Sequence, residues 1–150
     1  MFAGSDFVAN SCTRDAQLLI HLLGSGDLQR SLAAEDFAAR APALPREAPE
    51  AQVQSALRLW RRRELTRIAW RDLAGWADLT ETLAELSAFA DEAIASALSH
   101  ARRALAARYG EPRSPAGELQ PLVVIGMGKL GGRELNFSSD VDLVLLFPVR

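Results

Sequence analysis

Residues 121–150 read PLVVIGMGKLGGRELNFSSDVDLVLLFPVR, and this stretch decides the fold. Its first apolar run, residues 122–125, is β-branched and predicts a strand. A second strand is predicted over residues 140–148, and both of its faces are apolar. Such a pattern is typical of a strand that is buried on both sides. The stretch therefore predicts the order strand, glycine turn, short helix, strand.

The segment between these two strands has the composition of a phosphate-binding turn. Four of the chain's ten glycines lie here within seven residues, at Gly126, Gly128, Gly131 and Gly132. Glycine lets the backbone approach a ligand closely or adopt positive φ. Lys129, within this turn, is the only lysine among the 17 lysines and arginines. Because a compact ammonium suits a phosphate as a point charge, we predict that phosphate lies here.

Two aspartates, Asp140 and Asp142, open the second predicted strand, directly after Ser138 and Ser139. Residues two apart on a strand point to the same face, about 6.5–7 Å apart along the chain. Two carboxylates that close repel each other unless a cation lies between them. With phosphate substrates the usual cation is Mg²⁺, which binds one or two carboxylates together with phosphate oxygens. The pair therefore predicts a metal site.

Composition limits the classes of function. A chain of 150 residues with 49% hydrophobic residues can bury one core. Its net charge of −2 gives no general attraction to nucleic acid or to an anionic membrane. The single cysteine, Cys12, excludes a disulfide framework within the chain and favours a reducing cytoplasm. No apolar run approaches the ~20 residues of a membrane span, so we expect a soluble, cytoplasmic protein.

The residues before the motif predict helices. Thr13 is expected to cap a helix that Gly24 ends, and another helix is expected over residues 28–39. The proline-rich residues 40–50 predict a linker. Residues 1–120 are thus expected to form a helical region.

Two long helices are expected within that region. The first spans about residues 51–75, and the second runs from a cap at Asp78 to Tyr109, with Glu81 completing a capping box. The first helix carries six arginines between Arg58 and Arg71. A solvated face is the simplest interpretation of these arginines; the alternative is a surface for an anionic partner or part of a nucleotide pocket.

The glycines also spell G-x-G-x-x-G at Gly126, Gly128 and Gly131, the fingerprint of a dinucleotide-binding unit. That unit needs a full crossover helix and an acidic residue about 20 positions further on. Here the next strand is expected about eight residues after Gly132, and its far end is apolar. Dinucleotide binding therefore ranks last among the hypotheses.

Residues 126–143, GMGKLGGRELNFSSDVDL, resemble the signature of the glutamine synthetase adenylyltransferase and adenylyl-removing enzymes. The resemblance extends to residues 61–87 and to SDFVA at residues 5–9. It implies an α+β fold, in which an N-terminal helical bundle leads into the first two strands of a nucleotidyltransferase (polymerase-beta-like) sheet. Residues 121–150 would begin that catalytic core.

The resemblance also implies a function. Family members carry one half that removes AMP from a tyrosine of glutamine synthetase by phosphorolysis, giving ADP, and another half that attaches it from ATP. NFSSD, residues 136–140, resembles the amino-terminal, removing half. Bacterial nitrogen regulation through the PII signal protein is implied as well. The family's pattern assigns metal binding, by Mg²⁺ or Mn²⁺, and catalysis to Asp140 and Asp142. The positions that match its nucleotide- and phosphate-binding turn are Gly128, Lys129, Gly131, Gly132 and Ser139.

One part of the family's site is not found in this sequence. The family requires a further carboxylate on a later strand, and Glu134, on the expected short helix, is a poor substitute. A two-stranded piece with two apolar faces is also marginal in water. We therefore expect an incomplete catalytic core that is inactive alone. An alternative is a non-catalytic helical module that binds glutamine synthetase or PII.

Overall fold

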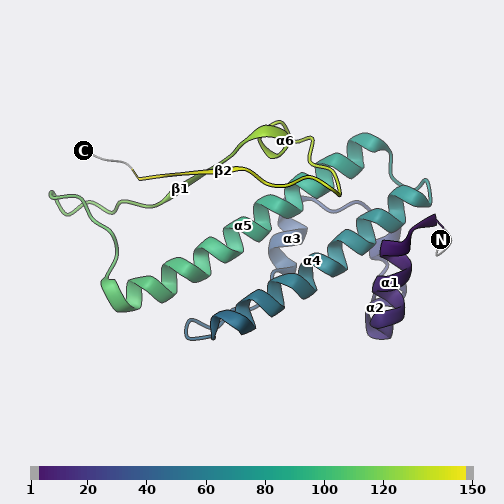
Figure 1. Cartoon of the computed structure of the whole chain (residues 1–150), viewed down its shortest axis with the longest axis horizontal. Coiled ribbons are helices and arrows are strands. Elements are labelled where there is room, and N and C mark those ends of the chain that lie inside the picture. Colours follow the sequence, from purple (N-terminus) through teal and green to yellow (C-terminus); the bar gives the residue numbers. More distant parts are fainter. Residues whose placement is uncertain (1–3, 148–150) are drawn as a thin grey trace.

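The computed structural model describes residues 4–147, and the two long helices form its central layer (Figure 1). The helices and strands, in chain order, are α1 Asp6–Arg14, α2 Ala16–Gly24, the 3-10 helix η2 Asp27–Gln29, α3 Ala34–Arg40, α4 Glu50–Leu73, α5 Leu79–Tyr109, β1 Val123–Gly126, α6 Gly128–Gly131 and β2 Leu143–Leu146. The chain is mainly helical with one two-stranded sheet, which confirms the α+β prediction. No helix in residues 4–147 is long and apolar enough to cross a membrane.

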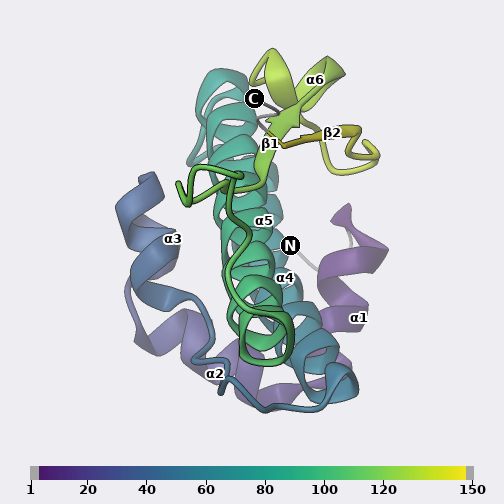
Figure 2. The ribbon, with the colours of Figure 1, turned by 90° about the vertical axis from the view of Figure 1, so that its left-hand side faces the viewer.

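The remaining elements surround the α4–α5 pair on three sides. Seen from its end, the pair has α3 on one side, α1 on the opposite side, and α6 with the two strands on a third (Figure 2). α1 and α2 pack on α4 through small apolar clusters, in which Val8 and Cys12 contact Ala69. The bundle thus presents one side of α5 to the glycine-rich motif.

The main core lies where α3, α4 and α5 meet the motif. Its buried members are Leu32, Phe37, Trp60, Leu65, Ile68, Leu86, Ala88, Phe89, Leu130 and Leu135. Phe89 of α5 makes edge-on ring contacts with Phe37 of α3 and Trp60 of α4, at centroid distances of 5.7 and 5.0 Å. Such contacts add to the burial of aromatic area. Because Leu130 and Leu135 belong to the same core, the motif is anchored to the bundle.

The helix boundaries agree with the sequence pattern where capping residues decide them. The Asp78 carboxylate accepts a hydrogen bond from the backbone N–H of Glu81 at 2.8 Å, and Gly110 follows the last residue of α5. The predicted Thr13 cap is wrong. Thr13 lies inside α1, where its hydroxyl donates to the Ala9 carbonyl, and Asp15 caps α2 by accepting from the Leu18 N–H at 3.1 Å.

Two further local expectations differ from the structure. The helix expected over residues 28–39 is interrupted: η2 ends at Gln29 and α3 begins at Ala34. The Glu81 side chain does not complete a capping box, because its carboxylate binds the Arg71 guanidinium at 2.5 Å. An ion pair between α4 and α5 has replaced the local contact.

The interpretation of the α4 arginines as a solvated face is wrong for Arg63, Arg67 and Arg71. The Arg67 side chain is fully buried and bonds the carboxylates of Glu64 at 3.1 Å and Glu85 at 2.7 Å. These three arginines turn inward because acidic partners on η2 and α5 neutralise them. Buried charges of this kind persist only when they are paired and hydrogen-bonded.

Asp27 of η2 is the acidic partner at one end of this network. Its carboxylate is buried and lies 2.6 Å from both the Arg40 and the Arg63 guanidinium groups. Burial alone would raise the pKa of Asp27, but the hydrogen bond from Arg63 and the charges of Arg40 and Arg63 lower it below its ordinary value. The carboxylate thus fastens η2 and α3 to α4.

The two strands form an antiparallel pair in which Val123 faces Leu146 and Gly126 faces Leu143. The prediction that the second strand is buried on both sides is wrong for this structure, because all four residues of β2 are exposed. It is also shorter than expected: Asp140 and Asp142 precede it, and Pro148 lies outside the described residues. Within residues 4–147 no further strand covers this apolar pair.

Candidate functional site

The glycine turn connects the end of β1 to the start of β2 and is built by backbone hydrogen bonds. The Met127 N–H donates to the Asp142 carbonyl at 2.9 Å, which continues the strand pairing one step beyond the sheet. Gly128 then adopts φ +53° and starts α6, and the Gly132 N–H donates to the Gly128 carbonyl at 2.9 Å. The turn therefore folds back directly beside Asp142.

Gly131 is a glycine for a steric reason. A Cβ at this position would lie 2.6 Å from the Gly126 carbonyl oxygen, which is backbone and cannot move aside like a side chain. Only a glycine allows α6 to pack this closely on the end of β1. The same close packing keeps the turn compact.

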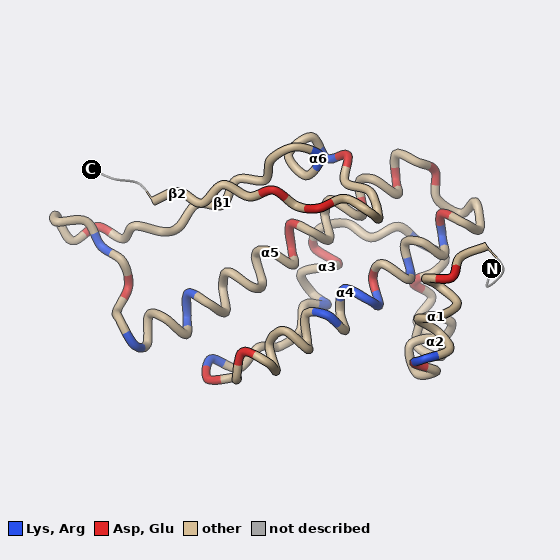
Figure 3. Tube along the Cα trace, viewed as in Figure 1, with Lys and Arg blue, Asp and Glu red and all other residues tan. Residues whose placement is uncertain are grey.

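Asp142 is the residue that brings the two halves of the motif together. A Cβ built on Gly128 would lie 3.7 Å from the Asp142 Oδ2 atom, so this carboxylate borders the turn. Asp140 and Asp142 are both exposed. The acidic stretch before β2 and the blue position at α6 lie near each other in Figure 3. The structure thus places a carboxylate and the glycine backbone side by side, as a phosphate and its metal would require.

Lys129 lies on α6 with its side chain exposed. It forms no ion pair with any residue in the described range 4–147. Lys129 differs in this respect from the buried and half-buried arginines, which form ion pairs: Arg40, Arg63, Arg67 and Arg71. Its ammonium is available to an anionic ligand at the turn.

Ser139 is engaged in a local turn. Its hydroxyl donates to the Asn136 side-chain oxygen at 2.7 Å and accepts from the Asn136 N–H at 3.4 Å. The Ser138 N–H donates to the same Asn136 oxygen at 3.2 Å. These bonds close residues 136–139 into a turn of the Asx kind. The turn fixes the chain immediately before Asp140.

The segment after this turn has two distinct sides. Its odd-numbered members, Val141 and Leu143, line a cavity of about 260 Å³ against α4 and α5, together with Ser139 at the end of the turn. Asp142 instead borders the glycine turn. The apolar side chains of the segment thus face α4 and α5 across this cavity, and the Asp142 carboxylate lies next to the glycine turn.

The carboxylates of the motif fit part of a divalent-metal site. Mg²⁺ is held by one or two protein carboxylates together with substrate phosphates and water, and Asp140 with Asp142 match that number. In residues 4–147 no cluster of three or more histidine, cysteine, aspartate or glutamate side chains is close enough to enclose a metal. Glu134 does not join the pair into such a cluster.

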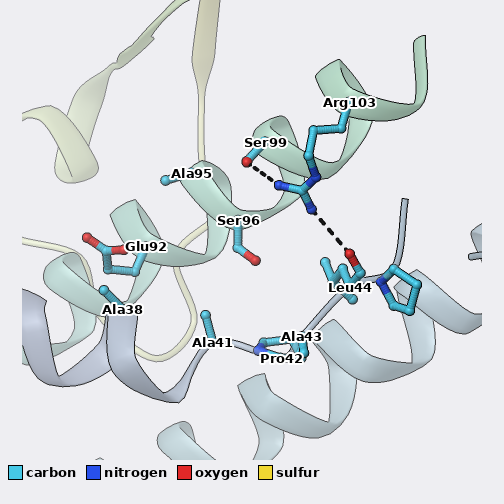
Figure 4. Close-up of a pocket in the computed structure, with 11 residues that line it drawn as sticks. Ala38, Ala41, Pro42, Ala43, Leu44, Glu92, Ala95, Ser96, Ser99 and Arg103 are labelled. Carbon is cyan, nitrogen blue, oxygen red and sulfur yellow. Dashed lines mark hydrogen bonds between the residues drawn. The ribbon is translucent and has the colours of Figure 1, made fainter. Parts of the chain in front are cut away.

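Another pocket among the described residues lies elsewhere and does not belong to this site. It has a volume of about 590 Å³ and is lined by the end of α3, residues 41–45 and α5, without any residue of the motif (Figure 4). The Arg103 guanidinium closes one end of it by donating to the Ser99 hydroxyl at 2.6 Å and to the Leu44 carbonyl at 3.2 Å. Glu92 and Arg103 are the charged residues that line it.

Sequence reasoning missed the residues that attach the motif to α5. The backbone N–H of Leu135 donates to the Ser87 hydroxyl at 3.3 Å, and the Arg133 guanidinium bonds the Asp91 carboxylate at 2.9 Å. One signal in the sequence could have identified the first contact. Ser87 is a polar residue that directly follows Leu86 within the apolar stripe of α5, where a hydroxyl needs a partner.

The geometry does not fit a dinucleotide-binding unit. That unit joins two parallel strands by a full crossover helix, whereas β1 and β2 are antiparallel and α6 has only 4 residues. The spacing of the glycines therefore misleads when it is taken alone.

The chain is similar throughout to one family of bacterial proteins. The sequence model of the family described as glutamate-ammonia ligase adenylyltransferase matches residues 1–150. Proteins named bifunctional glutamine synthetase adenylyltransferase/adenylyl-removing enzyme are similar over nearly the whole chain. The one from Thioalkalivibrio sulfidiphilus is 49% identical over 151 residues, covering 100% of this chain and 16% of the relative. Those from Nitrosococcus oceani and Shewanella loihica are 43% and 42% identical, with 99% of this chain covered in both and 16% and 15% of the relatives. The chain thus spans about one sixth of their length.

Proposed function

Because the chain belongs to the glutamate-ammonia ligase adenylyltransferase family, we propose that residues 121–147 carry part of a metal-dependent nucleotidyl-transfer site. The reaction is the removal of AMP from adenylylated glutamine synthetase by phosphorolysis, giving ADP. The observation that carries the proposal is the Asp142 carboxylate beside Gly128, which joins the aspartate pair to the glycine turn. Its effect would be the regulation of glutamine synthetase.

Each site residue has a role in this proposal. Asp140 and Asp142 hold Mg²⁺ or Mn²⁺, and the metal neutralises charge on the transferred phosphoryl group. Lys129 and the backbone of the turn at Gly128, Gly131 and Gly132 contact phosphate oxygens. The Ser139 hydroxyl, which is bonded to Asn136, would serve the nucleotide indirectly by keeping the segment before Asp140 in place.

The direction of transfer rests on two short motifs. NFSSD at residues 136–140 and SDFVA at residues 5–9 resemble the adenylyl-removing half of the family, which favours removal over addition of AMP from ATP. A pocket of about 530 Å³ brings these two motifs together, because Ser5 and Phe7 line it together with Phe137 and Ser138. Control by PII in the bacterial cytoplasm is part of the same proposal.

The fold proposed for the whole protein is the nucleotidyltransferase fold. The exposed apolar residues of β1 and β2, among them Val123, Leu145 and Leu146, are the support for it, because such strands need further strands or helices to cover them. We propose that the catalytic core begins at about residue 121 and includes a third carboxylate outside this chain.

A second candidate function is supported by a different observation. Within residues 4–147, Glu134, Asp140 and Asp142 do not come together into a cluster that could hold a metal, and Arg58, Arg61 and Arg62 on α4 form no ion pair. These features favour a non-catalytic helical module whose basic surface binds glutamine synthetase or PII.

Metal binding by the 150-residue chain tests the first proposal. We expect Mn²⁺ to bind when it is titrated into the chain. Asp140→Asn or Asp142→Asn should lower the Mn²⁺ affinity at least about tenfold, as is typical when a group that supports a metal site is removed. Glu35→Gln is the matched control, because it removes one exposed carboxylate on α3 that has no contact with the motif. If all three variants bind Mn²⁺ like the parent chain, the metal assignment fails. Retention of glutamine synthetase by such a chain, without metal binding, would support the second candidate.

A further inference from the structure

Ser87 is the buried polar residue of α5 that contacts the motif. Its side chain is fully buried, its hydroxyl donates to the Leu83 carbonyl at 2.8 Å, and its oxygen accepts from the Leu135 N–H at 3.3 Å. A serine inside a helix often bonds the carbonyl four residues earlier. The second bond is different, because it reaches a residue 48 positions away, in the motif.

The contact is located at the only firmly buried part of the motif among the described residues. Leu130 and Leu135 are buried with Leu86 and Phe89 in the main core. From residue 137 onward, by contrast, most side chains are exposed, and a cavity of about 260 Å³ separates the segment from α4 and α5. The position of the aspartate segment over the bundle therefore depends on how Leu135 is held.

Leu135 is also close to the aspartates along the chain. The closed turn of residues 136–139 follows it directly and leads into Asp140. Because Asn136 and Ser139 bond each other, Leu135 and Asp140 are joined by a short segment that is itself held closed by hydrogen bonds. A fixed link thus runs from the helix to the proposed metal ligands.

A second contact lies one helical turn further along α5. The Asp91 carboxylate bonds the Arg133 guanidinium at 2.9 Å, and Arg133 has φ +57°, a conformation that is uncommon for a residue with a side chain. Both side chains are about half exposed, and exposed pairs contribute little to stability. The Arg133–Asp91 pair is therefore a weak surface contact of the motif with α5, whereas the Ser87 hydroxyl holds the motif at a buried position.

We propose that Ser87 is a positioning residue for Asp140 and Asp142: its buried hydroxyl holds the backbone of Leu135 and thereby sets where the segment that leads to these aspartates lies over α5. The inference rests on the proposed function, because it assigns Ser87 to that same site. Ser87 itself touches neither substrate nor metal.

The test compares Ser87→Ala with Thr66→Val. Thr66 is also fully buried, and its hydroxyl donates to the Arg62 carbonyl four residues earlier at 2.7 Å, but it has no bond to the motif. Each variant removes one buried hydroxyl from a long helix. Only Ser87→Ala also leaves the Leu135 N–H without its acceptor, which adds the cost of an unsatisfied buried donor.

The first readout is independent of activity. In amide NMR spectra of the 150-residue chain, Ser87→Ala should shift the signals of residues 135–142 and speed hydrogen exchange at Leu135, whereas Thr66→Val should leave them in place. If Ser87→Ala does not fold, Ser87→Cys, which fills the space of the hydroxyl but accepts hydrogen bonds only weakly, is measured in its place. Equal spectra in this region for the two hydroxyl-deleted variants would overturn the inference.

The second readout uses the protein as its gene encodes it. Removal of AMP from adenylylated glutamine synthetase should show a kcat about 10–100-fold lower in Ser87→Ala, the scale of a small misplacement of catalytic groups. KM for the protein substrate should stay unchanged, and Thr66→Val should retain the parent kcat. A parent protein without turnover would refute the proposed function, while the NMR result would still decide the role of Ser87. Equal kcat values for both variants in an active protein would refute the positioning role alone.

Discussion

The Arg67→Met substitution tests the buried ion network most severely. Methionine is unbranched and matches the aliphatic stem of arginine, so the variant removes mainly the guanidinium group with its charge and its hydrogen bonds. Arg67 is fully buried and bonds the carboxylates of Glu64 and Glu85, and its guanidinium lies 5.7 Å from the centre of the Phe37 ring. Removing it leaves buried negative charge without compensation.

The size of the effect follows from what remains. Glu64 keeps its pair with Arg63, and Glu85 keeps the hydrogen bond from the Leu32 N–H at 2.5 Å. Breaking a buried pair from one side costs about 3–5 kcal/mol, within a typical total of about 5–15 kcal/mol. For a chain of this size the loss corresponds to a fall in Tm of about 6–20 °C.

The assay is urea unfolding of the 150-residue chain, followed by far-ultraviolet circular dichroism. Arg62→Met on the same helix is the control: its side chain is exposed and forms no ion pair in residues 4–147, so the change should stay within about 0.5 kcal/mol. Adding Glu85→Gln to Arg67→Met should restore part of the loss, because it removes the uncompensated charge. If Arg67→Met and Arg62→Met unfold at the same urea concentration, Arg67 is solvated and the reasoning is refuted.

Two other predictions concern pH and the turn. Arg63 holds the pKa of Asp27 below its ordinary value. The ionised Asp27 carboxylate therefore stabilises the fold above the unfolded pKa of about 3.9, and this stabilisation is lost as pH falls through the lower folded pKa. The difference in unfolding free energy between the parent and Asp27→Asn should therefore be constant from pH 7 to about 4 and shrink below that; a difference unchanged in strong acid would contradict this. Gly131→Ala should perturb the NMR signals of β1 and β2, because its Cβ would lie 2.6 Å from the Gly126 carbonyl. Gly24→Ala, which has no atom within 4 Å of the new Cβ, should leave these signals unchanged. If Gly131→Ala also leaves the signals of β1 and β2 unchanged, the turn is more open than the structure shows.

The long helices were predictable because local signals decide them. A helical period, the cap at Asp78 and the stop at Gly110 are all close in sequence to the boundaries they set. Which of the α4 arginines are buried and which are exposed could not be predicted from local signals. Arg67 pairs with Glu85 and Arg71 pairs with Glu81, and both glutamates are on the next helix. The sequence of α4 alone therefore shows only an excess of positive charge.

The site was predictable to a similar, partial extent. The glycine turn and the aspartate pair are contiguous in sequence, and the structure places Asp142 beside Gly128. β2 begins at Leu143 instead of the predicted Asp140, because only Leu143–Leu146 pair with β1 as a strand. The attachment through Ser87 is a contact across 48 residues: the position of Ser87 in the apolar stripe of α5 indicates that its hydroxyl needs a partner, but it does not identify Leu135 as that partner.

The most direct measurement of the central claim is phosphate-dependent release of ADP from adenylylated glutamine synthetase by the protein as its gene encodes it. With Mg²⁺ or Mn²⁺ present, the parent should release ADP, and Asp140→Asn and Asp142→Asn should lose this activity while keeping the parent's circular dichroism spectrum. Glu35→Gln should release ADP at the parent rate. Near-normal release by both aspartate variants would contradict the assignment of these residues as the metal-binding pair.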